Sequence, residues 1–158
     1  MIVGIDPGKA GGIAFISPDG VNDAMAMPLM GKDIDGAEVA AILRSLNADT
    51  VIIEKSQAMP GQGVTSMFNY GAGFGRLLGI CEALGLSYRL VTPQRWKGVV
   101  LAGTAKDKDA AIAFVRRAYP SINLTPGRKR TAHDGIADAV CLAEYGRQLM
   151  IPGLEKAE

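Results

Sequence analysis

The sequence has few cysteines and no long apolar run. Its 158 residues include two cysteines, Cys81 and Cys141, and no CxxC pair. Both lie among apolar residues of predicted helices, which is typical of core residues in a reducing compartment rather than of a disulfide framework. The opening MIVGID acquires charge too early for a signal peptide, and no apolar stretch approaches the roughly 18 residues of a membrane span. We therefore expect a soluble, cytoplasmic protein.

Internal repeats and low-complexity segments are also absent from the sequence. Hydrophobic residues make up 48% of the chain, which is enough for a buried core at this length. A second domain would not fit. We expect one domain over residues 1–150 and a short C-terminal tail over residues 151–158.

Net charge is close to neutral, at +1, but its distribution is uneven. Residues 1–85 contain five Lys or Arg and nine Asp or Glu, whereas residues 86–130 contain only Asp107 and Asp109 as acids. The ten basic residues of this second region are Arg89, Arg95, Lys97, Lys106, Lys108, Arg116, Arg117, Arg128, Lys129 and Arg130. A basic cluster is often only a solvated face, but it also fits a polyanionic partner.

The order of predicted elements indicates an α/β fold. Three closely spaced strands over residues 1–28 predict an antiparallel meander. A helix over 36–46 followed by the strand TVIIE predicts a right-handed crossover, with TVIIE parallel to the first strand. The remaining predicted elements are a helix over 66–85, a strand over 87–92, a helix from Pro93, a basic helix over 104–119 and a last helix over 133–150. Together they predict a five-stranded mixed sheet flanked by helices.

The predicted helix over 66–85 contains four glycines: Gly71, Gly73, Gly75 and Gly79. Each costs about 1 kcal/mol of helix stability relative to alanine. Two interpretations fit equally well: local flexibility or a break in the helix, and close approach of a second backbone at a dimer interface.

Four acidic residues are predicted to meet at one edge of the sheet. Asp6 ends the first strand, and Glu54 ends the strand expected to lie parallel beside it. Ligand sites of α/β sheets form at the carboxyl ends of parallel strands. Asp134 and Asp138 are one helical turn apart, so they share one face of the last helix. The sequence therefore predicts a cluster of four carboxylates.

A bound cation would stabilise such a cluster. Unpaired carboxylates at close range raise one another's pKa. Mg²⁺ binds a few carboxylates while keeping several waters, and two such ions about 3.5 to 4 Å apart can support phosphodiester cleavage. Each acid taken alone is more typical of a turn, a strand exit or a helix cap. Their joint placement in apolar surroundings favours the metal site.

Four motifs in order carry a resemblance to a known family. GIDPGKAGGIAF, VIIEKSQ, TPQRWKG and HDGIADAVCLAEYG resemble the RuvC family of Holliday junction resolvases, especially the short forms encoded by bacteriophages. The resemblance spans residues 1–147. It implies a ribonuclease H-like fold, a homodimer, and symmetric cleavage of four-way DNA junctions with two Mg²⁺ or Mn²⁺ ions. It also favours the interface interpretation of the glycine-rich helix.

The resemblance also implies roles for the acids. Asp6 and Glu54 match the first two metal ligands of the family, and Asp138 matches the last. The third ligand of many relatives precedes the last by three residues, where this chain has Gly135. Asp134, one residue further back, is the expected substitute. His133 is the fallback ligand or water-positioning base.

Basic and polar residues are expected to contact the DNA. Lys97 and Lys108 resemble two family lysines near the scissile phosphate, although Lys106 competes with Lys108 for that position. Trp96 is expected to be a core or orienting residue. The further residues expected to bind DNA are Arg95, Lys106, Arg128, Lys129, Arg130 and Gln57.

One departure from the family concerns the opening of the junction. Some relatives have a base-stacking aromatic residue where this chain has Gln57, although Met59 and Phe68 lie nearby in sequence. The cleavage preference and the residue that unstacks the junction therefore stay open. Two alternative functions also stay open: a related nuclease acting on RNA or on an RNA–DNA hybrid, and a DNA-binding module without catalysis.

Overall fold

A five-stranded mixed sheet forms the centre of the molecule. The computed structural model describes residues 1–17, 22–55, 57, 61–105, 107–128 and 130–150. The strand order is β3-β2-β1-β6-β7, in which β1 is antiparallel to β2 and parallel to β6, and β6 is parallel to β7. The strands are β1 (Ile2–Asp6), β2 (Gly12–Ile16), β3 (Asn22–Ala26), β6 (Thr50–Glu54) and β7 (Tyr88–Val91).

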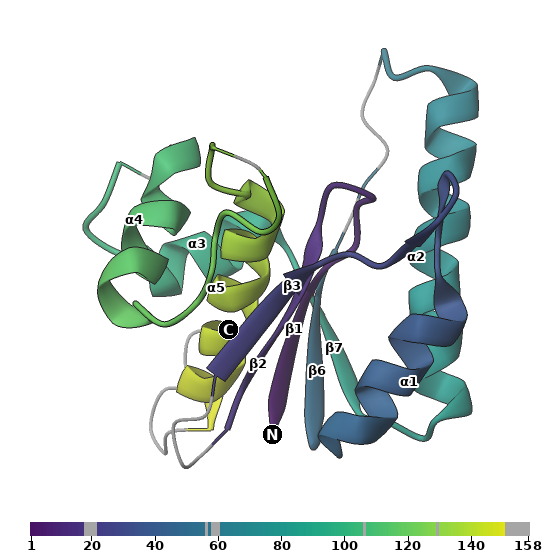
Figure 1. Cartoon of the computed structure of the whole chain (residues 1–158), viewed down its shortest axis with the longest axis horizontal. Helices are drawn as coiled ribbons and strands as arrows, with labels where there is room; N and C mark the ends of the chain where they lie inside the picture. Colours follow the sequence, from purple (N-terminus) through teal and green to yellow (C-terminus); the bar gives the residue numbers. More distant parts are fainter. Residues whose placement is uncertain (18–21, 56, 58–60, 106, 129, 151–158) are drawn as a thin grey trace.

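Helices cover both faces of the sheet (Figure 1). One face carries α1 and α2, and the other carries α3, α4 and α5. A separate apolar core lies on each side of the sheet. The larger core surrounds Trp96 and the buried side of α5, and the other contains Ile5, Val39 and Leu77. The helices are α1 (Gly36–Leu46), α2 (Val64–Ala83), α3 (Pro93–Val100), α4 (Lys108–Ala118) and α5 (Asp134–Leu149).

Side-chain caps set where most of the helices begin. Asp35 accepts hydrogen bonds from two backbone amides at the start of α1, and Asp107 does the same for α4. Thr92 caps α3, where Pro93 takes the first position and loses no helical hydrogen bond. The Nδ1 atom of His133 accepts from the Ile136 amide at the start of α5. The caps fix which residues each helix presents near the strand ends.

Glycines allow α5 to pack closely against β1 and β2. A Cβ atom at Gly4 would lie 2.1 Å from the Ala139 carbonyl oxygen, and one at Gly135 would lie 2.2 Å from the Ala10 carbonyl oxygen. Neither distance is possible for a real Cβ, so only glycine fits at these two positions. The first turns of α5 are therefore held against the end of β1.

The predicted α/β fold and its mixed five-stranded sheet are confirmed, including the parallel pairing of the first and fourth sheet strands. Two short strands, β4 (Leu29–Met30) and β5 (Asp33–Ile34), form an additional hairpin that was not predicted. Strands of two residues are too short for a pattern of alternation to be visible. The basic helix predicted from residue 104 begins instead at Lys108, because Asp107 caps it.

Three further expectations concern the tail, membrane spans and the cysteines. The predicted tail, residues 151–158, lies outside the described residues. Among the residues that are described, no helix is long and apolar enough to cross a membrane. Cys81 and Cys141 are buried free thiols, as expected of core residues.

Candidate active site

Two of the predicted acids lie at adjacent strand ends. Asp6 is the last residue of β1 and Glu54 is the last residue of β6. These strands are parallel neighbours, and Ile5 pairs with Ile53, so the two acids follow at corresponding positions. Both side chains are partly buried. In Figure 1 these strand ends lie at the same end of the sheet as the start of α5.

The start of α5 brings two more carboxylates to this end of the sheet. Asp134 is the first residue of the helix and is exposed, whereas Asp138 lies one turn later and is partly buried. The charges of Asp134 and Asp138 both reach Asp6 strongly enough to raise the pKa of its carboxyl. The charges of Glu54 and Asp134 thus act on both Asp6 and Asp138.

The raised pKa values of two carboxyls reflect burial first and neighbouring negative charge second. Burial, and then the charges of Glu54 and Asp138, raise the pKa of Asp6 to about 7. The pKa of Asp138 is raised to about 6, mainly by burial, with Lys97 acting in the opposite direction and Glu54 and Asp134 adding to the rise. Two carboxyls with raised pKa values at one strand edge are typical of a functional site rather than of a structural ion pair.

Lys97 and Trp96 approach the acids from α3. The Lys97 charge stabilises the ionised form of Asp138, which puts this lysine beside the cluster. Its Nζ atom also lies 5.2 Å from the centroid of the Trp96 ring, within the range of a cation–π contact. Trp96 is fully buried, and its indole Nε1–H donates to Oε2 of Glu54 over 2.7 Å. Trp96 is thus both a core residue and an orienting residue.

His133 is only 8% exposed and acts as a cap. Its Nδ1 atom accepts the Ile136 amide over 3.2 Å, so this nitrogen already has a hydrogen-bonding role in starting α5. The position expected of a third ligand in many relatives, Gly135, has no room for any side chain. A side chain at Gly135 would collide with the backbone of the turn after β1, and a carboxylate one residue earlier, at Asp134, avoids this collision.

The donor set fits a hard divalent cation. Carboxylate oxygens suit Mg²⁺ or Mn²⁺, and added positive charge would relieve the repulsion between Asp6 and its neighbours. Within the described ranges, no three His, Cys, Asp or Glu side chains lie close enough together to hold a metal ion as they stand. Mg²⁺ keeps several waters and needs only one or two direct carboxylates, so the fit rests on the chemistry of these carboxylates and not on a complete set of ligands.

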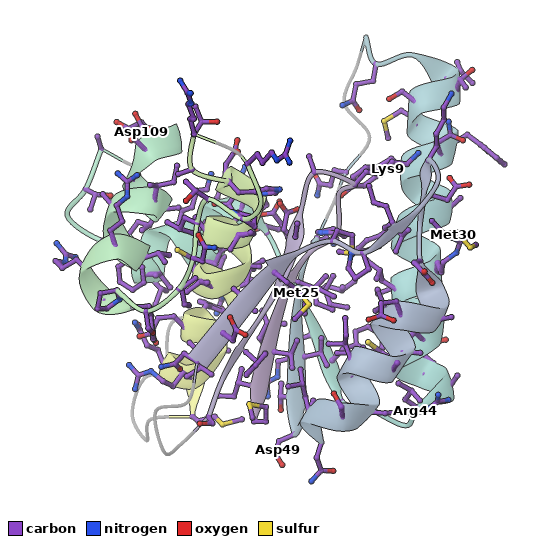
Figure 2. All side chains as sticks on the ribbon, viewed as in Figure 1. Lys9, Met25, Met30, Arg44, Asp49 and Asp109 are labelled. Atoms are coloured by element: carbon purple, nitrogen blue, oxygen red, sulfur yellow. The ribbon has the colours of Figure 1, made fainter. Side chains whose placement is uncertain are left out.

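The residues predicted to bind DNA are mostly exposed where the structure describes them. Arg128, Arg130 and Gln57 are exposed. Arg95 is exposed too, but its Nε–H donates to the Tyr145 hydroxyl over 2.9 Å, which ties it to α5. Lys106, Lys129 and Met59 lie outside the described residues, as does the side chain of Lys108. Figure 2 also shows Lys9 near α2, with Arg44 and Asp49 at the opposite end of the molecule.

A cavity beside Glu54 contains residues that the sequence did not single out. It has a volume of about 390 Å³ and lies between the end of β6, the start of α2 and the start of α3. We call it the glutamine cavity, because three glutamines line it. Its lining residues are Glu54, Lys55, Gln57, Gln62, Met67, Tyr70, Thr92, Pro93 and Gln94. Of these residues, only Glu54 and Gln57 were singled out from the sequence, Gln57 through its distance from Glu54.

Solved structures of Holliday junction resolvases share this architecture, although no protein-family model matches the chain and no curated protein is significantly similar to it. Thermus thermophilus RuvC in complex with a Holliday junction superposes with a TM-score of 0.65 at 14% identity, covering 94% of this chain and 93% of that chain. The yeast mitochondrial Holliday junction resolvase gives 0.56 at 14% identity, over 91% and 76%.

A viral resolvase also has a similar fold. The fowlpox virus resolvase, also solved with Holliday junction DNA, gives a TM-score of 0.54 at 18% identity over 94% of this chain and 98% of that one. Each match covers more than nine tenths of this chain. At these identities the likeness establishes the fold: the chain has the ribonuclease H-like α/β fold of the RuvC resolvases.

Proposed function

We propose that the protein is a metal-dependent endonuclease that resolves four-way DNA junctions and acts on related branched DNA. One observation carries the proposal: Asp6 and Glu54 end adjacent parallel strands, the charge of Asp138 on α5 raises the pKa of Asp6, and the charge of Lys97 lowers the pKa of Asp138. The likeness to resolvases, two of them solved with junction DNA, supports the choice of substrate. The acids and the lysine together suit a phosphodiester more than a neutral substrate.

The acidic and the basic side chains have different roles in the proposed reaction. Asp6, Glu54, Asp134 and Asp138 would hold Mg²⁺ or Mn²⁺, in all two ions per site. When bound, such ions activate water and stabilise the leaving oxygen in phosphodiester cleavage. Lys97 offsets the charge that develops on the scissile phosphate. The resemblance to the family implies a similar role for Lys108, with Lys106 as its competitor.

Exposed basic residues hold the DNA arms by their phosphates. Arg128 and Arg130 are exposed, and Arg95 reaches the surface from the same helix as Lys97. Lys129 belongs to this group by sequence, and Gln57 adds a neutral contact. Phosphate contacts of this kind orient the duplex without reading its sequence.

We propose that two copies pair through α2, which fits a substrate with two equivalent strands to cut. Val64, Phe68, Gly71, Gly75 and Gly79 recur every three or four residues, so they lie on one face of the helix. Val64 is 86% exposed and Phe68 is 75% exposed. A Cβ atom at any of the three glycines would meet nothing within 4 Å in this chain, which leaves room for a partner helix.

Comparison of substrates tests the activity. The proposed enzyme nicks a synthetic four-way junction symmetrically in Mg²⁺ and leaves an RNA hairpin and an RNA–DNA hybrid intact. Preferred cleavage of either RNA substrate would support the ribonuclease alternative instead. Binding without cleavage of any substrate would support the non-catalytic alternative. We expect the protein to act on DNA in the cytoplasm of a bacterial or phage-infected cell.

A further inference from the structure

The β4–β5 hairpin lies between α2 and the turn of residues 7–11. We call this segment the Asp6 turn, because it directly follows Asp6 at the end of β1. A hydrogen bond from the Asp35 amide to the Pro28 carbonyl oxygen closes the base of the hairpin over 2.9 Å. In Figure 2, Met30 of the hairpin lies beside α2. The hairpin is thus a closed unit with contacts to two other elements.

The first attachment of the hairpin is to α2. Ile34 of β5 is only 2% exposed, and a Cβ atom at Gly73 of α2 would lie 3.1 Å from its Cδ1 atom. Arg76, which follows Gly73 by about one helical turn, donates from its guanidinium to the Ile34 carbonyl oxygen. Hydrogen bonds from charged donors are stronger than those between neutral groups. The hairpin is therefore expected to follow any displacement of α2 at this level.

The second attachment is to the Asp6 turn. The Met27 amide, on the segment that leads into the hairpin, donates to the Gly11 carbonyl oxygen over 3.0 Å. The Lys9 ammonium lies 3.6 Å from the carboxylate of Asp33 in β5. A cavity of about 310 Å³ lies between the turn, the hairpin and α2, and both members of this ion pair line it. The pair therefore joins the hairpin to the turn beside an open space.

The Asp6 turn in turn contacts the carboxylate. The Gly8 amide donates to Oδ1 of Asp6 over 3.4 Å, and the Gly11 amide closes the turn on the Gly8 carbonyl oxygen over 2.9 Å. The Ala10 carbonyl packs against α5 at Gly135. The turn is thus held by α5 on one side and by the hairpin on the other. Groups that orient a metal ligand affect metal affinity without touching the metal.

We propose that the β4–β5 hairpin positions Asp6 for metal binding by joining α2 to the Asp6 turn, with Asp33 and Arg76 as positioning residues. This inference rests on the proposed metal-dependent cleavage. Both residues act through the hairpin and lie outside the acidic cluster. Because α2 is also the proposed dimer helix, the same contacts would connect the pairing of two copies with the geometry of each active site.

Hydrogen exchange in the metal-free protein tests the link without relying on activity. Asp33→Ala is expected to raise the exchange rate of the Gly11 amide by about two- to fivefold, the range for an exposed ion pair. Arg76→Ala is expected to raise exchange in both the hairpin and the turn. Lys32→Ala is the matched control, because it removes a charge from the exposed tip of the same hairpin, and it keeps the wild-type rates.

Titration with Mg²⁺ measures the consequence for the site, by melting temperature and by junction cleavage. Asp33→Ala and Arg76→Ala are each expected to need about two- to fivefold more Mg²⁺ for half of the full effect, with unchanged junction affinity. Lys9→Glu combined with Asp33→Lys is expected to restore the wild-type Mg²⁺ dependence that each single change impairs. Asp33 is 67% exposed, so its variants are expected to fold.

Wild-type exchange rates and wild-type Mg²⁺ dependence in both Asp33→Ala and Arg76→Ala would overturn the positioning role while leaving junction cleavage intact. Tighter junction binding by Asp33→Ala, without rescue by the exchanged charges, would also overturn it, because Lys9 would then contact a DNA phosphate instead. Absence of metal-dependent cleavage by the wild type would overturn the proposed function, and the role of the hairpin in metal binding with it.

Discussion

The indole Nε1–H of Trp96 donates to Oε2 of Glu54 over 2.7 Å, and Trp96 has no exposed surface. A hydrogen bond from a fully buried ring fixes the orientation of a carboxylate that has some freedom at the end of β6. Residues that orient metal ligands in this way affect metal affinity and activity although they touch neither the metal nor the substrate. Trp96 is therefore a positioning residue for the proposed site.

Replacement of Trp96 by Phe tests this role. Trp96→Phe keeps an aromatic ring in the core but removes the donor to Glu54. We expect junction cleavage to fall by about 10- to 100-fold and half-saturation to need more Mg²⁺. The measurement is the cleavage rate as a function of Mg²⁺ concentration, with the melting temperature and junction affinity measured alongside. An unchanged Mg²⁺ dependence in a folded variant would show that the hydrogen bond does not position Glu54.

The contact at Gly135 predicts a loss of stability. A Cβ atom there would lie 2.2 Å from the Ala10 carbonyl oxygen, and both partners are backbone. We expect Gly135→Ala to lower the free energy of unfolding by about 1–3 kcal/mol or more, measured by denaturant titration. Gly98→Ala is the control, because a Cβ atom at that position would meet nothing within 4 Å, and helix propensity would make the change neutral or stabilising. Equal stability of the two variants would contradict the packing account.

The fold was largely predictable from sequence because its signals are local. Short apolar runs separated by turn residues marked β1 and β2, and Asp35 and Thr92 mark helix starts through caps. The convergence of Asp6 and Glu54 followed from the parallel crossover. The steric exclusion at Gly135 was not predictable, because it depends on the Ala10 backbone, more than a hundred residues away in sequence.

Two other features could not be predicted from the sequence for similar reasons. The capping bond of His133 depends on where α5 begins, and the glutamine cavity combines side chains from three separate segments. Neither leaves a periodic pattern. The metal ligands, the dimer and the DNA contacts stay predictions, since they concern groups outside this chain.

The proposed dimer predicts a change of oligomeric state. Phe68→Glu introduces a charge on the exposed face of α2, where Phe68 is 75% exposed. We expect the variant to sediment as a monomer at concentrations where the wild type is a dimer, and to lose paired cleavage of junctions. Met150→Glu is the control, because Met150 is 54% exposed at the end of α5 and is expected to leave the dimer intact. A wild type that is monomeric at high concentration would contradict the pairing.

The raised pKa of Asp6 predicts a pH-dependent cost to stability. Its pKa is about 7 in the folded protein against an ordinary value of 3.8, so the folded state holds this proton more tightly than the unfolded state. The contribution of the Asp6 carboxyl to the free energy of unfolding therefore falls as pH rises from about 4 to about 7. We expect Asp6→Asn and the wild type to be similarly stable near pH 4. At pH 8 without divalent metal, the variant should be more stable by about 1 kcal/mol or more.

Thermal melts across this pH range measure the difference, about 2–4 °C for each kcal/mol at this chain length. Addition of Mg²⁺ at pH 8 should stabilise the wild type more than Asp6→Asn, because only the wild type has the complete acidic cluster. An equal response of the two proteins to Mg²⁺ would argue against Asp6 as a ligand.

Cleavage of a four-way junction in Mg²⁺ by carboxylate variants tests the central claim most directly. Asp6→Asn, Glu54→Gln and Asp138→Asn are each expected to abolish cleavage, while junction binding, measured by gel shift in the same samples, survives or becomes tighter. The wild type should cut both strands symmetrically. Normal cleavage by Asp138→Asn would contradict the proposed site.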